Sequence, residues 1–478
     1  MQNASRYHSV HYSLLLAGCL AVGITAGCKQ PPPAAPAAKT APLRVIVVDD
    51  APLAKTLARE WLAHTESQLD IVEVTTDKAA AAQQLPADVV IYPPGLIGSL
   101  AKADLLLPLD ESLLNDPEYA RDDISPLLRS QLTTWGRRTV AVPLGSPQMV
   151  LFYRADLLAQ QKLQPPQTWE EYQKVVEAFR TKPADVAIDD KAWQATAEPL
   201  AAGSGGELLL ARAASTAVHR DQLSPLMNLD SLEPLIAGPP FVRALEQLVA
   251  ASPADAHLDK LLSPAACYAK FLAGECALAI TWPMMLEQAP ATMLKPEQIG
   301  LALLPGSQEM FNPTSQSWEP LAADDSAHAP FLSGNGRMAS VSRASAQPRA
   351  ATQFLLWLSG PKLSGRIASH SATTVPFRTS HLRNADAWQP PQPVAHLTQY
   401  GELLATAQDN PRRLVAPRIP GSGQYLAALD QAVIAAVSQE KSAADALASA
   451  ADEWNKITAE RGRTSQQRAL RRSLGLSD

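Results

Sequence analysis

The 478-residue sequence has few aromatic side chains and little charge, and its acidic residues outnumber its basic ones. Aromatic residues make up 5% and charged residues 18% of the chain, and the formal net charge is −6. A protein that binds nucleic acid needs a basic face for the phosphates, so nucleic acid is not an expected partner. The nine histidines show neither His-x-x-x-His nor His-Glu-x-x-His spacing. We therefore expect no metal, no cofactor and no zinc-dependent chemistry.

The sequence has only one long hydrophobic run, and this run lies at the N-terminus. Arg6 precedes an apolar stretch over 14–27 that ends in Ala26-Gly27-Cys28. Small residues before a cysteine predict a lipoprotein signal peptide, 1–27, with Cys28 as the lipidated residue. Cys19, after Leu-Ala-Gly, is the alternative lipidation site. An uncleaved membrane helix is the other reading, although the stretch is shorter than the about 20 residues that span a bilayer.

The rest of the chain is expected to stand away from the membrane and to contain two cysteines. Residues 28–42 are rich in proline and alanine, which predicts an extended tether. Cys267 and Cys276 are nine residues apart. In an oxidising compartment they either form a disulfide or remain two buried thiols, and the spacing leaves both open.

Alternating strand and helix patterns follow the tether. Short β-branched runs at 43–50, 70–75 and 87–92, with a helical pattern from 52, predict a parallel α/β arrangement. At this length two lobes are expected. Extended runs that flank 143–147 indicate a crossing between them. Further strands are predicted at 277–281 and 299–304. Further helices are predicted at 168–179, 206–217, 241–250, 346–358, 425–438, 442–457 and 461–476. Thr168 and Glu171 form a capping box at the start of the first of these helices, and the last helix is basic and expected on the surface.

These pieces occur in an order that resembles a known family. The motifs that carry the resemblance lie at 87–90, 105–110, 139–143, 151–158, 165–171, 271–278, 304–306 and 350–360, and the pattern closes at Trp454. Over 43–460 the chain resembles the extracellular solute-binding proteins of the maltose-binding-like group (family 1), which serve carbohydrate ABC importers. Residues 209–214, 239–245, 418–421 and 467–476 add a likeness to long members from planctomycete-type bacteria.

The resemblance implies a two-lobed, type II periplasmic-binding-protein-like α/β fold with the ligand in a cleft between lobes joined by hinge strands. Lobe 1 is expected at 43–145 plus about 283–342, lobe 2 at 146–282 plus about 343–460, and a basic tail at 461–478. The implied function is capture of a sugar or sugar-like solute outside the cytoplasm, without catalysis. The implied partners are the permease subunits of an ABC importer and the membrane that holds the lipid, and the protein is expected to be a monomer.

Sugars are bound by aromatic faces and by carboxylates or amides, so candidates were sought after the ends of strands. Asp49 and Asp50 follow the first strand, where the alternative is a helix N-cap. Tyr92 and Pro93 follow the third strand, and a plain loop is the alternative.

Six more positions are candidates for ligand contact, and two of them lie in the crossing between the lobes. Gly145 and Ser146 either face the cleft or only serve the hinge. Trp282 is the leading stacking candidate, with a core tryptophan as the alternative, and Trp318, Trp193 and Glu198 complete the expected set.

Two other functions remain open from the sequence. One is a cell-surface enzyme or sensor that reuses the binding fold, although Asp49 and Asp50 point apart as neighbours and have no glycosidase pattern around them. The other is a binder of oxyanions, for which Arg378 and Arg418 are the available cations.

Overall fold

The computed structural model describes residues 41–189, 192–253, 261–322, 325–368, 370–388 and 396–476. The predicted signal peptide, Cys28, Cys19 and most of the predicted tether lie outside these ranges. Residues 42–478 form one compact unit, and it contains all the elements described below. Among the described helices, none combines the length and the apolar character that a bilayer span requires.

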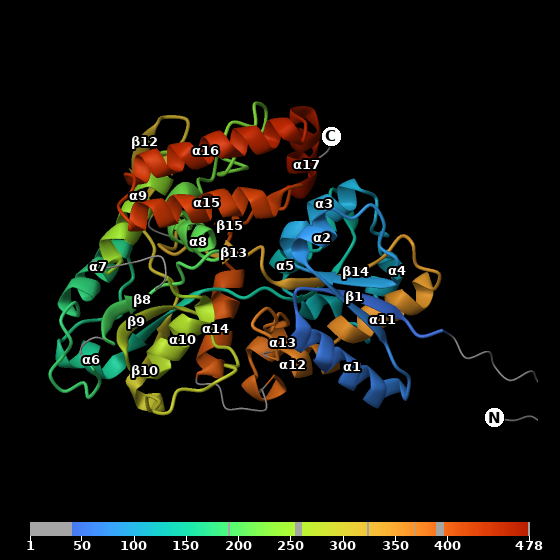
Figure 1. The fold of residues 1–478 in the computed structure, drawn as a ribbon, viewed down its shortest axis with the longest axis horizontal. Helices are drawn as coiled ribbons and strands as arrows, with labels where there is room; N and C mark the ends of the chain where they lie inside the picture. Colours follow the sequence, from blue (N-terminus) through green and yellow to red (C-terminus); the bar gives the residue numbers. More distant parts are fainter. Residues whose placement is uncertain are drawn as a thin grey trace, which may run out of the picture. The chain divides into compact units, whose positions relative to one another are not determined.

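The first sheet has five strands in the order β2-β1-β3-β14-β6 (Figure 1). Strands β1, β2 and β3 are parallel, and β14 runs antiparallel to both of its neighbours. The strands are β1 (Arg44–Val48), β2 (Asp70–Val74), β3 (Val89–Tyr92), β6 (Val142–Gly145) and β14 (Arg337–Val341). The three strands predicted at 43–50, 70–75 and 87–92 are therefore confirmed.

Helices pack against this first sheet and complete lobe 1. Their apolar residues recur at helical spacing, as in α1, where Leu53 and Leu57 are fully buried. The helices of lobe 1 are α1 (Ala51–Thr65), α2 (Thr76–Ala80), η1 (Pro94–Leu96), α3 (Ile97–Lys102), α4 (Glu111–Leu114), η2 (Arg121–Asp123), α5 (Pro126–Gln131), α11 (Pro348–Ser359) and α12 (Pro361–Ile367). A small hairpin, β4 (Thr134–Trp135) and β5 (Arg138–Thr139), precedes β6.

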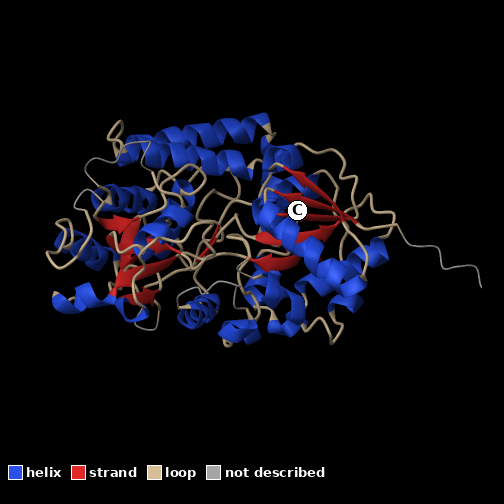
Figure 2. Ribbon diagram, turned by 60° about the horizontal axis from the view of Figure 1, so that its bottom comes forward, coloured by secondary structure: helices blue, strands red, loops and turns tan. Residues whose placement is uncertain are grey.

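The second sheet has four strands in the order β10-β7-β9-β8 and forms the centre of lobe 2. Figure 2 shows the two sheets as separate groups of strands, each with helices packed around it. The strands are β7 (Val150–Arg154), β8 (Gln194–Ala197), β9 (Cys276–Thr281) and β10 (Ile299–Ala302). All six residues of β9 are buried, as expected for a central strand.

Lobe 2 is rich in helices, and α8 is buried along its whole length. The predicted capping box of α7 is present, with Thr168 and Glu171 each bonded to the other's backbone. Helices α15 and α16 lie side by side (Figure 1). Trp454 of α16 donates to the carbonyl of Tyr425 of α15 at 2.8 Å. The helices are α6 (Ala155–Gln160), α7 (Trp169–Ala178), α8 (Gly205–Ala217), α9 (Pro239–Ala251), α10 (Pro264–Leu272), η4 (Pro296–Gln298), α14 (Leu397–Gln408), α15 (Ser422–Val437) and α16 (Ala443–Glu460).

The predicted lobe boundaries are wrong for two elements, β10 and α11. Strand β10 was assigned to lobe 1, but it pairs with β7 in the second sheet. Helix α11 was assigned to lobe 2, but it packs against β6 and β14 of the first sheet. The reason is that the chain returns to lobe 1 only through β14, after the whole stretch up to residue 332.

Short elements complete the connections. They are the hairpin β11 (Glu309–Asn312) and β12 (Ser317–Pro320), the pair β13 (Phe331–Leu332) and β15 (Leu414–Val415), α13 (Thr379–Leu382) and η5 (Ala385–Ala387). The predicted basic C-terminal helix is present as α17 (Arg463–Ser473), but it buries Gln466, Ala469 and Leu470 against its neighbours. Cys267 and Cys276 are buried free thiols, so the disulfide alternative is not formed in this structure.

Candidate functional site

The carboxyl ends of β1, β3 and β6 and the start of β14 meet at one edge of the first sheet. Two of these strands lead directly to lobe 2, because β6 continues through 146–149 into β7, and β14 is reached from β13 through 333–336. Asp49, Asp50, Tyr92 and Pro93 therefore lie at the edge where the lobes are joined. Ligands of open α/β sheets bind at such carboxyl edges.

The second sheet presents the matching edge. The end of β9 pairs with the start of β7, and the end of β8 lies beside it, since Thr281 pairs with Val150 and Ala197 with Ala279. Glu198 and Trp282, which follow these strand ends, are thus placed toward the junction. The structure brings eight of the ten sequence-predicted residues to this junction, and leaves out Trp193 and Trp318.

Asp50 is the centre of a polar network at the end of β1. Its side chain is 2% exposed and accepts from the backbone N–H of Leu53 at 3.1 Å, so Asp50 is the N-cap of α1. Its other oxygen lies 3.2 Å from Arg337 Nε and accepts the hydroxyls of Ser371, at 2.9 Å, and Thr373. Both carboxylate oxygens of Asp50 thus bind partners within the chain, so Asp50 links α1, β14 and the segment 371–373 at this edge.

Asp49 is exposed and has a left-handed backbone, with φ of 45°. Its carboxylate accepts from the N–H of Thr76 at 2.6 Å, and its carbonyl accepts from Arg337 Nη2 at 2.9 Å. A non-glycine residue in this conformation costs conformational energy that the surrounding bonds must offset. The bonds thus fix an exposed carboxylate at the junction edge.

The segment 371–375 lies between the two lobes. Ser371 and Thr373 bond Asp50 of lobe 1, whereas the carbonyl of Ala372 accepts from Trp282 Nε1 at 3.0 Å. The ring of Trp282 is half-buried. One indole edge is therefore oriented by a hydrogen bond, and part of the ring remains open to solvent.

Gly145 has a structural requirement of its own. Its φ is +128°, and a Cβ at this position would lie 2.5 Å from the backbone nitrogen of Val375. Both facts require glycine. The neighbouring Ser146 is 4% exposed and its hydroxyl has no hydrogen-bond partner within the structure. Gly145 thus serves the geometry of the crossing, while Ser146 holds an unsatisfied hydroxyl at the same place.

A second polar cluster lies where α8 meets α15 and the crossing segment 333–336. Glu207 of α8 accepts from Ser333 Oγ at 2.7 Å and from the N–H of Gly334 at 2.8 Å. Asp430 of α15 accepts from the N–H groups of Gly203 and Gly206 at 2.8 and 2.7 Å. Burial, with a smaller contribution from the charge of Asp430, raises the pKa of Glu207 to about 7 against these hydrogen bonds.

Beside this cluster, Asn335 is exposed within the crossing segment, and its backbone N–H donates to Ser333 Oγ at 2.9 Å. Sequence reasoning missed Asn335, Glu207, Asp430 and Arg337. A signal was available for Asn335 and Arg337 alone, namely the polar, glycine-containing stretch 333–336 immediately before the buried strand β14.

Tyr92, Pro93 and Glu198 lie at the junction edges but are buried. The hydroxyl of Tyr92 bonds Ser340 at 2.8 Å, and burial raises its pKa. Glu198 is paired with Arg212 Nη2, at 2.9 and 2.8 Å from its two oxygens, and accepts from the hydroxyl of Tyr172 at 2.7 Å. These contacts give the three residues packing and pairing roles in this structure.

The remaining predicted residues lie elsewhere. Trp193 precedes β8, at the end of the sheet away from the junction, and donates to the carbonyl of Phe179 at 2.9 Å. Trp318 lies on β12, where the guanidinium of Arg243 stacks 3.3 Å from its ring centroid. Arg378 is buried, bonded to main-chain carbonyls and 3.5 Å from Asp123, so its donors are occupied within lobe 1.

The junction offers hydrogen-bonding groups and an aromatic face from several segments. Carboxylate and amide groups at Asp49 and Asn335, and the ring of Trp282, are the types of group that hydroxyl-rich small molecules need. Among the described residues, no three His, Cys, Asp or Glu side chains are grouped so as to hold a metal ion.

Comparison with solved structures supports the same architecture. An ABC transporter solute-binding protein from Agrobacterium radiobacter K84 in complex with ribitol is 18% identical, with a TM-score of 0.64, covering 87% of this chain and 99% of that one. The sugar-binding protein MalE from Xanthomonas citri is 18% identical, with a TM-score of 0.61 over 88% and 98%. Maltose-bound T. maritima MalE3 is 16% identical, with a TM-score of 0.60 over 87% and 99%.

At these identities the likeness establishes a type II, two-lobed binding-protein fold. A search of curated proteins finds no match. The sequence profile of the bacterial extracellular solute-binding proteins matches residues 70–363, which is more than half of the chain. The chain therefore belongs to the bacterial extracellular solute-binding protein family.

Proposed function

We propose that this protein captures a sugar or polyol between its lobes and delivers it unaltered to the permease subunits of an ABC importer. The observation that carries the proposal is the junction itself, where exposed polar groups and a half-buried indole gather beside the chain crossings. Solved structures of the same fold carry ribitol, D-mannitol and maltose. These ligands share many hydroxyls and no charge, which matches a site of amides, carboxylates and an aromatic face.

Capture would proceed by closure of the lobes about the crossings at 146–149, 333–336 and 371–382. A ligand that contacts both lobes binds the closed form more tightly than the open form, and so shifts the population toward closure. Gly145 supports this role because its backbone passes directly against Val375. The lobes can thus pivot where the two main-chain segments touch.

Attachment to the membrane belongs to the same proposal. A lipid on Cys28, followed by the Pro/Ala-rich stretch 28–42, would hold the binding unit near its permease outside the cytoplasm. A monomer suffices, because one chain contains both lobes. Replacing Cys28 with serine should release the protein into the soluble fraction, and continued membrane association of that variant would contradict the proposed anchor.

The binding proposal is tested with a panel of pentitols, hexitols and maltodextrins in thermal unfolding and calorimetry. A true ligand at a hundredfold excess over its Kd stabilises the folded state by about 2.7 kcal/mol. Trp282→Ala should weaken binding at least tenfold. The matched control is Trp357→Ala, since Trp357 is also half-buried but lies on α11, away from the junction.

Two results would overturn the proposal. Equal affinity in the Trp282→Ala and Trp357→Ala variants would remove the junction as the site. Chemical conversion of the stabilising compound, followed by chromatography, would replace the transport function with an enzymatic one.

A further inference from the structure

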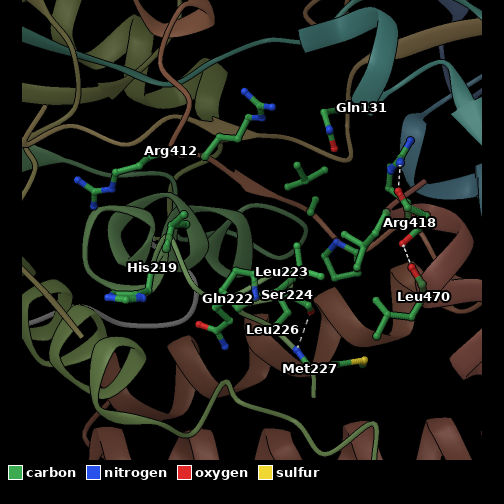
Figure 3. A pocket seen from close by; sticks show the side chains of 18 of the residues that line it. Gln131, His219, Gln222, Leu223, Ser224, Leu226, Met227, Arg412, Arg418 and Leu470 are labelled. Carbon is green, nitrogen blue, oxygen red and sulfur yellow. Dashed lines mark hydrogen bonds between the residues drawn. The ribbon is translucent and has the colours of Figure 1, made fainter. Parts of the chain in front are cut away.

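A hollow of about 520 Å³ lies apart from the residues of the lobe junction. It is enclosed by the segments 218–227 and 411–419, by α17 and by Gln131 at the end of α5. Figure 3 shows Arg412 and His219 on one side of it and Arg418 and Leu470 on the other. The volume lies in the range of sites that hold small organic molecules.

The charged residues around this hollow are mostly positive. Four arginines border it, namely Arg220, Arg412, Arg413 and Arg418, and the one carboxylate among its lining residues is that of Asp325. Within the described part of the chain, none of the four arginines forms an ion pair. The hollow therefore carries a net positive charge.

Two of these arginines are buried and bonded only to main-chain carbonyls. Arg412 donates to Ser326 and Ser215 at 3.0 and 2.6 Å, and Arg418 donates to Leu132 and Ser473 at 3.0 and 2.6 Å. Carbonyls solvate a guanidinium but do not neutralise it. Neither charge is therefore neutralised by a direct ion pair among the described residues, in a setting where solvent screens charges weakly.

Arg412 also has a buried hydrogen-bond donor without an acceptor. Its side chain is 8% exposed, and its buried Nε–H has no hydrogen-bond partner in the structure. Burial lowers the pKa of Arg412, and the nearby Arg220 lowers it further, whereas Asp325 raises it. Burial also lowers the pKa of Arg418, to about 10. An anion in the hollow would relieve each of these costs, because it supplies an acceptor and an opposite charge.

The other walls are apolar. Leu226, Met227, Ile419 and Leu470 line the hollow and are buried. Leu223 also lines it and is 66% exposed, which is unusual for a leucine. A fully hydrated inorganic ion would leave these surfaces without a partner, whereas an aliphatic body would cover them.

We propose that this hollow is a second ligand site, and that it takes a small organic anion with an apolar body: a carboxylate or phosphate group against the arginines and an aliphatic chain against the leucines. This site is independent of the lobe junction and of the sugar that we propose for it. It uses residues from α17 and from the segments 218–227 and 411–419. Among them, only Arg418 was named from the sequence, as a cation available to an oxyanion.

The test is calorimetry of the purified protein with octanoate and octyl phosphate below their micellar concentrations. Octanol and inorganic phosphate are the two control probes, since each carries only one half of the ligand chemistry. We expect the two anions to bind at least tenfold more tightly than either control, and to lose affinity as salt rises.

The variants are chosen so that folding is preserved. The double variant Arg220→Ala/Arg413→Ala removes one exposed and one half-buried arginine, and Leu223→Glu places a carboxylate at the rim. Each should weaken octanoate binding at least tenfold, while the exposed Arg349→Ala on α11 should leave it unchanged. Unaltered melting temperatures would show that the variants remain folded.

Three outcomes would overturn the proposal. They are the absence of binding by both anions, unchanged affinity in the double variant, and equal binding of octanol and octanoate, which would reduce the hollow to an apolar cavity. Sugar binding at the junction is measured separately in the same variants, so failure of one site is distinguishable from failure of the other.

Discussion

We expect Glu207 to make the folding stability of the protein depend on pH near neutrality, because its carboxyl group titrates at a higher pH in the folded chain than in the unfolded chain. Its carboxyl is buried between α8 and the crossing segment, where desolvation and the charge of Asp430 raise the pKa from 4.5 to about 7. As pH rises from 4.5 to 7, the unfolded chain loses this proton while the folded chain keeps it. Folding stability therefore falls over this window, fully retained below 4.5 and lost as pH passes the folded pKa.

The size of the loss follows from the shift. A difference of about 2.5 pKa units corresponds to about 3 kcal/mol at 1.36 kcal/mol per unit. Glu207→Gln removes the titrating group but keeps an oxygen that can accept from Ser333 and from the N–H of Gly334. The variant should therefore lack this part of the pH dependence, and its stability relative to the wild type should rise as pH increases.

The assay is urea unfolding at several pH values between 4.5 and 8, followed by tryptophan fluorescence. The control is Glu402→Gln, because Glu402 is an exposed glutamate on α14. The difference in unfolding free energy between wild type and Glu207→Gln should change by about 3 kcal/mol across the range. A difference that stays constant with pH would show that Glu207 titrates normally and would refute the reasoning.

Three further substitutions test the junction and the core. Asp50→Ala should destabilise by at least about 3 kcal/mol in urea unfolding, because it removes a helix N-cap and leaves Arg337 buried without its ion pair. Gly145→Ala should lower the melting temperature and weaken ligand-induced closure in small-angle scattering, since its Cβ cannot fit against the facing backbone. Arg212→Ala should cost about 3–5 kcal/mol of unfolding free energy by leaving Glu198 buried and unpaired.

Each of these has a matched control. Asp50→Asn keeps an N-cap acceptor and should cost less than Asp50→Ala. Gly423→Ala places a Cβ in open space and should be close to neutral. Arg180→Ala removes an exposed pair with Glu177 and should cost under about 1 kcal/mol. If a variant and its control lose the same unfolding free energy, the contact named for that residue does not account for its contribution to stability.

Much of the fold could be predicted because local patterns decide it. Runs such as 45–48 and 277–281 are buried on both faces, so their β-branched and apolar residues leave little alternative to a central strand. The capping box at Thr168 is a contact over three residues and needs no tertiary information. The allotment of β10 and α11 to lobes failed, because neither segment's sequence says which sheet it joins.

The candidate site was only partly predictable, for a related reason. The strand-end rule placed Asp49 and Trp282 at the junction, but it could not show that Asp50 is saturated by hydroxyls more than 300 residues away. Nor could this rule show that Glu198 is paired with Arg212 on the next helix and is therefore not free to contact a ligand. Pairing between distant segments decides which polar side chain is free, and a single sequence does not carry that information.

Helix α17 has a consequence for the motion of the protein. The carbonyl of Arg472 accepts from the N–H of Gly136 in lobe 1 at 2.9 Å, whereas Gln466 donates to the hydroxyl of Tyr425 in lobe 2 at 2.9 Å. In the lobe motion that we propose, a helix bonded to both lobes would limit how far they separate before one of the hydrogen bonds breaks. The last turns of the chain would therefore act as a stop on the open form, and a chain shortened before Arg463 should open wider and hold its ligand for less time.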